Sequence, residues 1–351
     1  MSKGPGMTWL AALSEIEDLE DAEFDGALVE RFEQQFAGRT PRPIRFSTPT
    51  FKEYSSTELS GCSKNSFPAF SVTAGACGLN CDHCQKKILE PMIPATNPEM
   101  LEQKVRHLIE TQGLSGFLLS GGSNKRNEIA YSRYMPVVER LKKDHPVLKV
   151  AVHSALLDER RAREMESAGV DTVMMDVIGA DETINEVYKL DRPVADFEAT
   201  LAALCGTSME VTPHIVIGLH YGRILGEANA LDIVSRYDVT ALVLVVIMPF
   251  YAKPGTFVTP STSDVGRVFL EARQRLPDKQ VLLGCARPPG MHKRVTDAYA
   301  IMAGLDGIAF PADGAVSVAH TIGRPFEQAH SCCSIKLGSN IQANLQSSFA
   351  A

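Results

Sequence analysis

The sequence has no long run of apolar residues and no excess of positive charge. No stretch approaches the roughly eighteen consecutive apolar residues that a membrane-spanning helix requires, so we expect no membrane partner. The formal net charge is −7 and the lysines and arginines are scattered, so no basic surface for RNA or DNA is expected. The first nine residues contain no apolar core of the kind that a targeting segment needs. We therefore expect a cytoplasmic protein.

Disulfides are also unexpected, although the chain contains eight cysteines. Reducing compartments keep thiols free, so this many cysteines in a cytoplasmic chain indicate metal or redox chemistry. Three of them, Cys77, Cys81 and Cys84, form a Cys-x-x-x-Cys-x-x-Cys run directly after an apolar, strand-like stretch. Thiolates are the ligands that iron–sulfur clusters prefer, and three ligands around four irons leave one iron open to another molecule.

A structural zinc site is the alternative for these cysteines. Such sites are normally built from paired Cys-x-x-Cys or Cys/His sets with four protein ligands. His83 lies between Cys81 and Cys84 and is available as a fourth ligand, but both of its neighbours would already bind the metal and the loop would be strained. The spacing therefore favours the iron–sulfur interpretation.

Apolar runs and helical patterns alternate about eight times along most of the chain. The predicted strands cover residues 70–73, 116–120, 148–153, 172–177, 211–217, 241–247, 281–284 and 307–310. The predicted helices between them cover residues 97–112, 129–144, 157–168, 194–205, 225–236, 263–275 and 291–303. This order predicts an α/β fold, a full or nearly closed TIM-like (β/α) barrel with its site at the carboxyl ends of the strands. A doubly wound open sheet is the alternative.

Segments on either side of the barrel complete the predicted organisation. Apolar residues recur at helical spacing over residues 8–37, with Gly26 and an acidic run weakening the middle. We expect an N-terminal helical extension and irregular linker over residues 1–60, the barrel over 61–325, and a C-terminal tail over 326–351 that carries candidate ligands for a second metal centre.

The cysteine spacing after a first strand resembles the radical S-adenosylmethionine (SAM) superfamily. The resemblance implies a [4Fe-4S] cluster whose open iron binds the amino and carboxylate groups of SAM, and an electron from the cluster that cleaves SAM to a 5′-deoxyadenosyl radical. The sequence departs from the family at His83, where an aromatic residue is usual, although a histidine still allows packing near the adenine. The SAM-binding residues that the resemblance implies are Gly121, Gly122, Ser123, Asp176, Arg192, Ile217 and Gly218.

These residues have assigned roles, and some of them have an alternative. The two glycines resemble the Gly-Gly-Glu motif that binds the SAM amino group, with Ser123 in place of glutamate; an ordinary turn is the alternative. Asp176 is placed to accept from the ribose hydroxyls, and Arg192 either pairs with the SAM carboxylate or ends a solvated helix. Ile217 and Gly218 resemble the adenine-contacting segment. His153, at the end of the third predicted strand, either points into the cavity or caps the barrel.

Two later segments resemble the biotin-synthase-related branch. One is the Pro254-Gly255-Thr256 loop, which in that branch closes over SAM and substrate, and the other is Gly284-Cys285-Ala286-Arg287 at the end of the seventh predicted strand. A cysteine at a strand end can face the barrel cavity, so we expect a second iron–sulfur cluster. Its candidate ligands are Cys62, Cys285, Cys332 and Cys333. Scattered buried thiols are the alternative for this set, and Cys205 is expected to be a core thiol.

Within that branch the nearest resemblance is to the archaeal-type two-protein lipoyl synthase pair. It implies sulfur insertion into an octanoyl chain, with the second cluster as the sulfur source. The implied partners are an octanoylated lipoyl domain or glycine cleavage H protein, a sister radical SAM protein, and an electron donor such as ferredoxin or flavodoxin. Two alternatives remain: another radical SAM reaction, such as methylation or cofactor maturation, and a non-catalytic iron–sulfur partner subunit.

Overall fold

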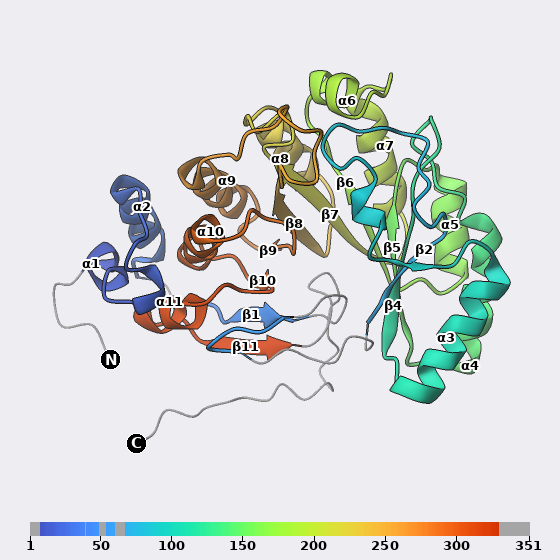
Figure 1. Cartoon of the computed structure of the whole chain (residues 1–351), viewed down its shortest axis with the longest axis horizontal. Coiled ribbons are helices and arrows are strands. Elements are labelled where there is room, and N and C mark those ends of the chain that lie inside the picture. The colour runs from blue at the N-terminus through green and yellow to red at the C-terminus, as the bar shows by residue number, and fades with distance from the viewer. Residues whose placement is uncertain (1–7, 39, 49–53, 60–66, 330–351) are drawn as a thin grey trace.

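Eleven parallel strands form one curved sheet with helices along its outer face (Figure 1). The computed structural model describes residues 8–38, 40–48, 54–59 and 67–329. The strands are β1 Ile44–Ser47, β2 Ala69–Ser71, β3 Ile93–Pro94, β4 Gly116–Ser120, β5 Lys149–Ser154, β6 Thr172–Asp176, β7 Glu210–Ile217, β8 Ala241–Val246, β9 Gln280–Leu283, β10 Gly307–Ala309 and β11 Phe326–Ala329. They lie in the order β11-β1-β10-β9-β8-β7-β6-β5-β4-β2-β3, and every neighbouring pair is parallel. The predicted α/β barrel is confirmed, as a half-barrel with β3 and β11 at its two edges.

Helices connect the strands in the alternation that the sequence predicts. They are α1 Trp9–Leu13, α2 Gly26–Phe36, α3 Pro98–Gln112, α4 Met135–Asp144, α5 Glu159–Ser167, α6 Asp181–Val187, α7 Val194–Cys205, α8 Glu227–Ser235, α9 Thr262–Arg275, α10 Met291–Met302 and α11 Ala315–Thr321. Local capping explains why α3 was predicted so closely. The Asn97 side chain accepts from the Met100 N–H at 2.7 Å, and Gly113 ends the helix in the left-handed conformation with φ 63°.

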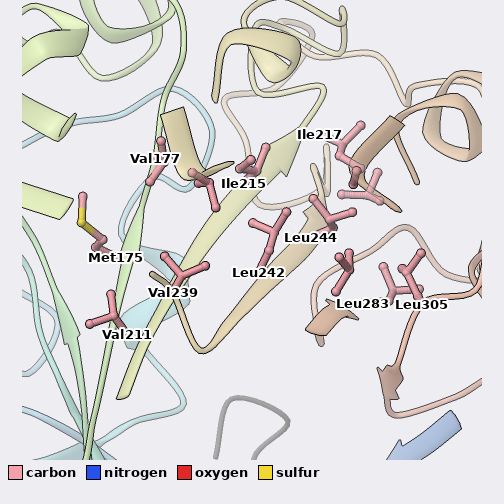
Figure 2. Packing of buried hydrophobic residues seen from close by; sticks show 14 of the residues in the cluster. Met175, Val177, Val211, Ile215, Ile217, Val239, Leu242, Leu244, Leu283 and Leu305 are labelled. Atoms are coloured by element: carbon pink, nitrogen blue, oxygen red, sulfur yellow. The ribbon is translucent and has the colours of Figure 1, made fainter. Parts of the chain in front are cut away.

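The two faces of the sheet differ because successive side chains on a strand point to opposite sides. On β8, Leu242 and Leu244 belong to the large core between sheet and helices, together with Ile215 and Leu283 of the neighbouring strands (Figure 2). Their neighbour Val243 belongs to a separate small cluster with Ala241 and Leu282. This second cluster lies on the concave inner face, which is where a half-barrel holds its site.

The N-terminal extension is not one continuous helix. It consists of α1, a short 3₁₀ turn at Glu17–Leu19, and α2, with the acidic segment between the two helices. The Asp25 side chain accepts from the Leu28 N–H at 3.1 Å and so caps the start of α2, while the Asp25 N–H donates to the Tyr299 hydroxyl oxygen at 2.7 Å.

The sheet extends beyond the predicted barrel range of 61–325 on both sides. β1 pairs with β10 and β11, so residues 44–47 and 326–329 are part of the sheet. No helix in the described part of the chain is long and apolar enough to span a membrane.

Candidate metal centre

The loop that carries the three cysteines leaves β2 at the carboxyl edge of the sheet and is closed by tight turns at both ends. Ala74 begins it with φ 52°, and Gln85 and Lys86 end it with φ 47° and 65°. These left-handed conformations turn the backbone sharply. The Gln85 side-chain amide donates to the Cys81 carbonyl at 2.9 Å and links the end of the loop to its middle. The three cysteines therefore lie within one compact loop, as predicted.

Two of the three thiols converge with a histidine. One ligand atom each from Cys81, His83 and Cys84 lies within 4.8 Å of the other two. The Cys77 sulfur instead lies against Ser123, 3.6 Å from its carbonyl oxygen and 3.9 Å from its hydroxyl oxygen. The cysteine loop thus presents two converging sulfurs, with the third at the boundary between this loop and the one after β4.

The pKa values of Cys81 and Cys84 move in opposite directions because one thiol donates a hydrogen bond to the other. The hydrogen bond between the Cys81 and Cys84 thiols raises the pKa of Cys81. Burial and the nearby charges of Cys84 and Cys77 act in the same direction. Donation from Cys81, and then from His83, lowers the pKa of Cys84 to about 4. Buried sulfurs that repel each other's negative charge are stabilised together only by positive charge between them, and a metal supplies it.

His83 takes a different position from the one expected. Its ring stacks on Tyr188, with 4.8 Å between ring centroids and 30° between planes, so the packing near adenine that we expected is packing against a protein side chain here. Its Nδ1 atom is buried without a hydrogen-bond partner among the described residues. A sulfur–nitrogen set of this kind also suits zinc. The structure therefore also offers a donor set for the zinc alternative. Metal analysis distinguishes zinc from an iron–sulfur cluster.

Asp82, which we did not single out from the sequence, anchors the cysteine loop. Its buried carboxylate pairs with the Lys189 ammonium at 2.9 Å and accepts from the Tyr221 hydroxyl at 3.3 Å. Its N–H donates to the Val187 carbonyl at 2.9 Å, and its own carbonyl accepts from the Lys253 N–H at 2.8 Å. The loop is thereby fixed to the end of α6 and to the loop after β8, which includes the Pro254-Gly255-Thr256 segment. In the sequence, the signal that could have identified Asp82 is the position of its carboxylate between two candidate metal ligands.

The two glycines after β4 are required by contact with the cysteine loop. A Cβ atom on Gly122 would lie 2.1 Å from the Ala76 carbonyl oxygen and 2.6 Å from the Cys77 Cβ, and one on Gly121 would lie 2.7 Å from Val72. The Gly122 N–H donates to the Thr73 hydroxyl at 2.7 Å. Backbone packs directly on backbone here, which explains the glycines without a ligand. The SAM-binding roles of Gly121, Gly122 and Ser123 stay predictions.

Polar side chains line the inner face where β5, β6 and β7 end. Asp176 accepts from the Tyr188 hydroxyl at 3.1 Å, and its other carboxylate oxygen lies 3.8 Å from the His153 Nε2. The His153 and His214 rings meet edge to face, with centroids 5.4 Å apart. Burial, and then the charge of His153, lowers the pKa of His214 to about 4. Of the two options for His153, the structure shows the inward position.

The His214 ring is therefore neutral near pH 7 and has a defined tautomer. Its Nδ1 lies 3.1 Å from the Thr212 carbonyl oxygen, which can only accept, so Nδ1 carries the proton. The lone pair of its Nε2 atom remains available. Together with the Asp176 carboxylate, this gives the inner face two hydrogen-bond acceptors, which suits a ligand with hydroxyl groups such as a ribose.

Three predicted SAM-binding residues lie apart from this polar surface. Ile217 is fully buried in the core on the helix side of the sheet (Figure 2), so only its backbone is left to contact a ligand. Gly218, with φ 78°, donates its N–H to Glu227 at 2.8 Å. Arg192 pairs with Asp196 at 3.1 Å and lines a groove beside α7, as in the solvated-helix-end alternative.

Of the predicted second set of ligands, Cys285 is the one that the structure describes. It follows β9 directly at the carboxyl edge of the sheet and is half-buried. Cys62, Cys332 and Cys333 lie outside the described residues. Burial raises the pKa of Cys205, at the end of α7, to about 11, which fits the expected core thiol.

A buried ion pair fixes the segment around Cys285. The Arg287 guanidinium pairs with Asp297 at 2.6 Å, and the two side chains are 0% and 1% exposed. Arg287 also donates to the carbonyls of Gly284, Ala309 and Phe310. These bonds hold the end of β9 against β10, directly beside Cys285.

The fold is shared with solved structures of low sequence identity. HydG, a maturase of the [FeFe]-hydrogenase, superposes with a TM-score of 0.54 and 15% identity over 87% of this chain and 65% of HydG. Methylornithine synthase (PylB) superposes with a TM-score of 0.53 and 12% identity over 87% of this chain and 86% of PylB. This chain thus spans about two thirds of HydG, and at these identities the likeness shows the fold alone. No curated protein matches the sequence.

A parallel half-barrel with a three-cysteine loop after a strand defines the class as an α/β half-barrel protein with a candidate metal site. The sequence model of the Radical SAM superfamily matches residues 71–222, from β2 through the polar inner face to the loop after β7. The matched residues include the cysteine loop and the carboxyl ends of β4 to β7. The three cysteines of the loop described above lie within the matched residues.

Proposed function

We propose that this chain is a radical SAM sulfur-insertion enzyme of the lipoyl synthase type, which adds sulfur to an octanoyl chain carried on a protein. The observation that carries the proposal is Cys285. It lies at the carboxyl edge of β9, on the same edge as the cysteine loop but five strands away in the sheet order from β4, beside which that loop packs. A metal held there would lie at the same edge of the sheet as the first centre.

The inner face supports an aliphatic substrate because it is divided in two. Towards the cysteine loop, on β5 to β7, it carries the polar residues His153, Asp176 and His214. Towards Cys285, on β8 and β9, it carries the apolar cluster of Ala241, Val243, Val245 and Leu282. SAM is polar and an octanoyl chain is not, so this division suits the two reactants in that order.

Each part of the site then has its own residues. Cys77, Cys81 and Cys84 hold the first cluster. Gly121, Gly122, Asp176 and the Ile217 backbone seat SAM. Cys285 holds the second cluster with Cys62 and one or both of Cys332 and Cys333. The bound groups supply hydrogen abstraction from a methylene and the sulfur that replaces it. The protein side chains orient SAM over the polar half and exclude water from the apolar half. The substrate is carried by a lipoyl domain or H protein, and a sister radical SAM protein adds the other sulfur.

Metal analysis tests the two-centre arrangement. Reconstituted protein is expected to bind two clusters, about four irons in each if both are cubanes, and no zinc. The triple variant with alanine at positions 77, 81 and 84 should keep the second cluster, and Cys285→Ala should keep the first, as seen by Mössbauer spectroscopy. Cys205→Ala is the matched control and should keep both. A stoichiometry of one cluster that Cys285→Ala leaves unchanged contradicts the proposal, as does bound zinc.

Product analysis tests the reaction. Reduced protein incubated with SAM and an octanoylated lipoyl domain is expected to yield 5′-deoxyadenosine and a sulfur-containing acyl chain on the lysine, detected by mass spectrometry. Cys285→Ala should still form 5′-deoxyadenosine and no sulfur product. Formation of 5′-deoxyadenosine by wild type without any sulfur product favours another radical SAM reaction, for which the polar inner face suits a hydroxylated or charged substrate. Absence of both favours the non-catalytic partner subunit.

A further inference from the structure

His83 stands between two candidate cluster ligands, at a position that is usually aromatic in the superfamily that the cysteine spacing resembles. A phenylalanine or tyrosine ring packs at such a position but has no ring nitrogen. A neutral imidazole has the same flat shape and carries one N–H donor and one lone pair. The histidine therefore offers a hydrogen bond inside the cysteine loop that an aromatic ring cannot make.

One nitrogen of this imidazole lacks a partner. The Nδ1 atom is buried and makes no hydrogen bond among the described residues, although buried polar atoms in native proteins are nearly always paired. A ring nitrogen of His83 lies within 4.8 Å of the sulfurs of Cys81 and Cys84. Sulfurs that hold a metal are deprotonated and can only accept. The nitrogen beside them is therefore suited to be the donor.

Tyr188 holds the imidazole in the cysteine loop. Its ring stacks on His83, with 4.8 Å between centroids and 30° between planes, and its hydroxyl donates to Asp176 at 3.1 Å. Its carbonyl oxygen lies 3.9 Å from the Cys81 sulfur. The tyrosine is buried, so the stack keeps the His83 ring beside the sulfurs and away from solvent.

Cys84 is the sulfur that His83 affects. Donation from Cys81, and then from His83, lowers the pKa of the Cys84 thiol to about 4, with burial opposing. The Cys81 sulfur instead faces the Tyr188 carbonyl, which is an acceptor. A group that stabilises negative charge on the Cys84 sulfur also stabilises it when that sulfur is part of a cluster.

We propose that His83 donates a hydrogen bond from Nδ1 to the Cys84 sulfur and thereby raises the reduction potential of the first cluster. The inference rests on the first cluster of the proposed function, and not on sulfur insertion. On reduction the cluster gains one electron, which dithionite supplies in the test below, and its net charge becomes more negative by one unit. Hydrogen bonds to a more negative acceptor are stronger, so the N–H stabilises the reduced form more than the oxidised form.

The variant His83→Phe tests the donor, because it keeps a ring that stacks on Tyr188 and removes both ring nitrogens. Tyr221→Phe is the control. It removes a hydroxyl that lies 3.3 Å from the Asp82 carboxylate of the same loop, and it leaves the surroundings of the sulfurs in place. The pair of variants therefore compares the loss of a contact to sulfur with the loss of a contact elsewhere on the loop.

Redox titration with dithionite, followed by EPR in the absence of SAM, measures the potential of the first cluster. Its signal is recognised because the triple alanine variant at positions 77, 81 and 84 lacks it. In His83→Phe the equilibrium constant for one-electron reduction should fall about tenfold, which corresponds to about 59 mV towards more negative potential. The control variant should match wild type within about twofold.

Pulsed EPR of the reduced wild-type cluster, with ¹⁵N-labelled histidine and in H₂O and D₂O, distinguishes a donor from a metal ligand without any variant. A donor gives a weak nitrogen coupling together with an exchangeable proton coupling, and His83→Phe should lose both while keeping its iron. A strong nitrogen coupling in wild type, or bound zinc that His83→Phe loses, makes His83 a metal ligand and overturns the inference.

The outcomes separate this inference from the proposed function. An unchanged potential in His83→Phe, or an equal fall in Tyr221→Phe, overturns the hydrogen bond and leaves the first cluster and its reaction intact. An unchanged potential combined with weaker binding of SAM, measured by equilibrium dialysis, shows that Nδ1 serves SAM instead. Wild type without a reducible cluster that depends on positions 77, 81 and 84 overturns both proposals, and the missing EPR signal identifies this case.

Discussion

At the scale of single residues, the buried ion pair between Arg287 and Asp297 is the strongest polar constraint near the candidate second centre. Asp297 also accepts from the Ala312 N–H at 2.7 Å. The variant Asp297→Asn leaves a buried guanidinium without its counter-charge, so we expect a loss of about 3–5 kcal/mol in the free energy of unfolding. Urea unfolding measures it. Arg140→Gln, which breaks an exposed pair with Glu102, is the control and should cost under about 1 kcal/mol; equal losses in both variants contradict the expectation.

The histidine on the inner face predicts a pH dependence. The pKa of His214 is lowered to about 4 in the folded protein, mainly by burial, with His153 lowering it further and Asp176 opposing. The unfolded chain has the ordinary value of about 6.5 and so binds the proton more readily. The neutral His214 ring makes its full contribution to the free energy of unfolding above pH 6.5. This contribution is lost as the pH falls towards 4, and the free energy of unfolding then changes by at most about 1.4 kcal/mol per pH unit.

Anaerobic thermal unfolding between pH 5 and pH 8 checks this dependence. The variant His214→Gln should show a shallower fall in melting temperature towards pH 5 than wild type. His107→Gln, at an exposed position on α3, is the control and should keep the wild-type profile. A His214→Gln profile parallel to wild type would sink the assignment of a neutral, buried ring.

At the scale of elements, the contact between the cysteine loop and the loop after β4 controls whether the metal site forms. In Gly122→Ala the added methyl group would overlap the Ala76 carbonyl oxygen and the Cys77 Cβ, so the cysteine loop must move. We expect the variant to fold and to lose iron from the first centre, as measured by iron content and cluster absorbance. Gly75→Ala is the matched control within the same loop, because its added methyl group meets no atom within 4 Å. Retention of full iron by Gly122→Ala contradicts the role of this contact.

Elements with a local pattern could be predicted from the sequence, and elements formed by distant pairing could not. All eight predicted strands are present, because long apolar runs such as that of β8 are buried on both faces. β1, β3 and β11 were not predicted, and β1 joins the sheet only by pairing with β10 and β11 at the other end of the chain. The candidate site follows the same rule. The spacing of Cys77, Cys81 and Cys84 is local, whereas the contact of Asp82 with Tyr221 joins residues 139 positions apart.

At the scale of the whole molecule, the half-barrel closes its N- and C-terminal parts against each other. β1 lies between β10 and β11, with Phe46 against Phe326 at 5.6 Å between ring centroids and Arg45 paired with Glu327 at 2.7 Å. The predicted boundary at residue 325 would remove β11 and leave β1 with an open edge. Such edges are prone to pair with other chains. The stable unit therefore includes residues 326–329, and the candidate ligands Cys332 and Cys333 follow it directly in sequence.

Two truncations separate stability from metal binding at this boundary. A chain that ends at Pro325 should melt at a lower temperature than wild type and aggregate, because Phe46 loses its cover and β1 loses its partner. A chain that ends at Ala329 keeps the whole sheet, so its melting temperature should equal that of wild type without the second cluster, such as Cys285→Ala. Its iron content should fall to that of the first centre alone. Equal stability of the two truncations would place β11 outside the folded unit, and full iron in the chain ending at Ala329 would remove Cys332 and Cys333 from the second centre.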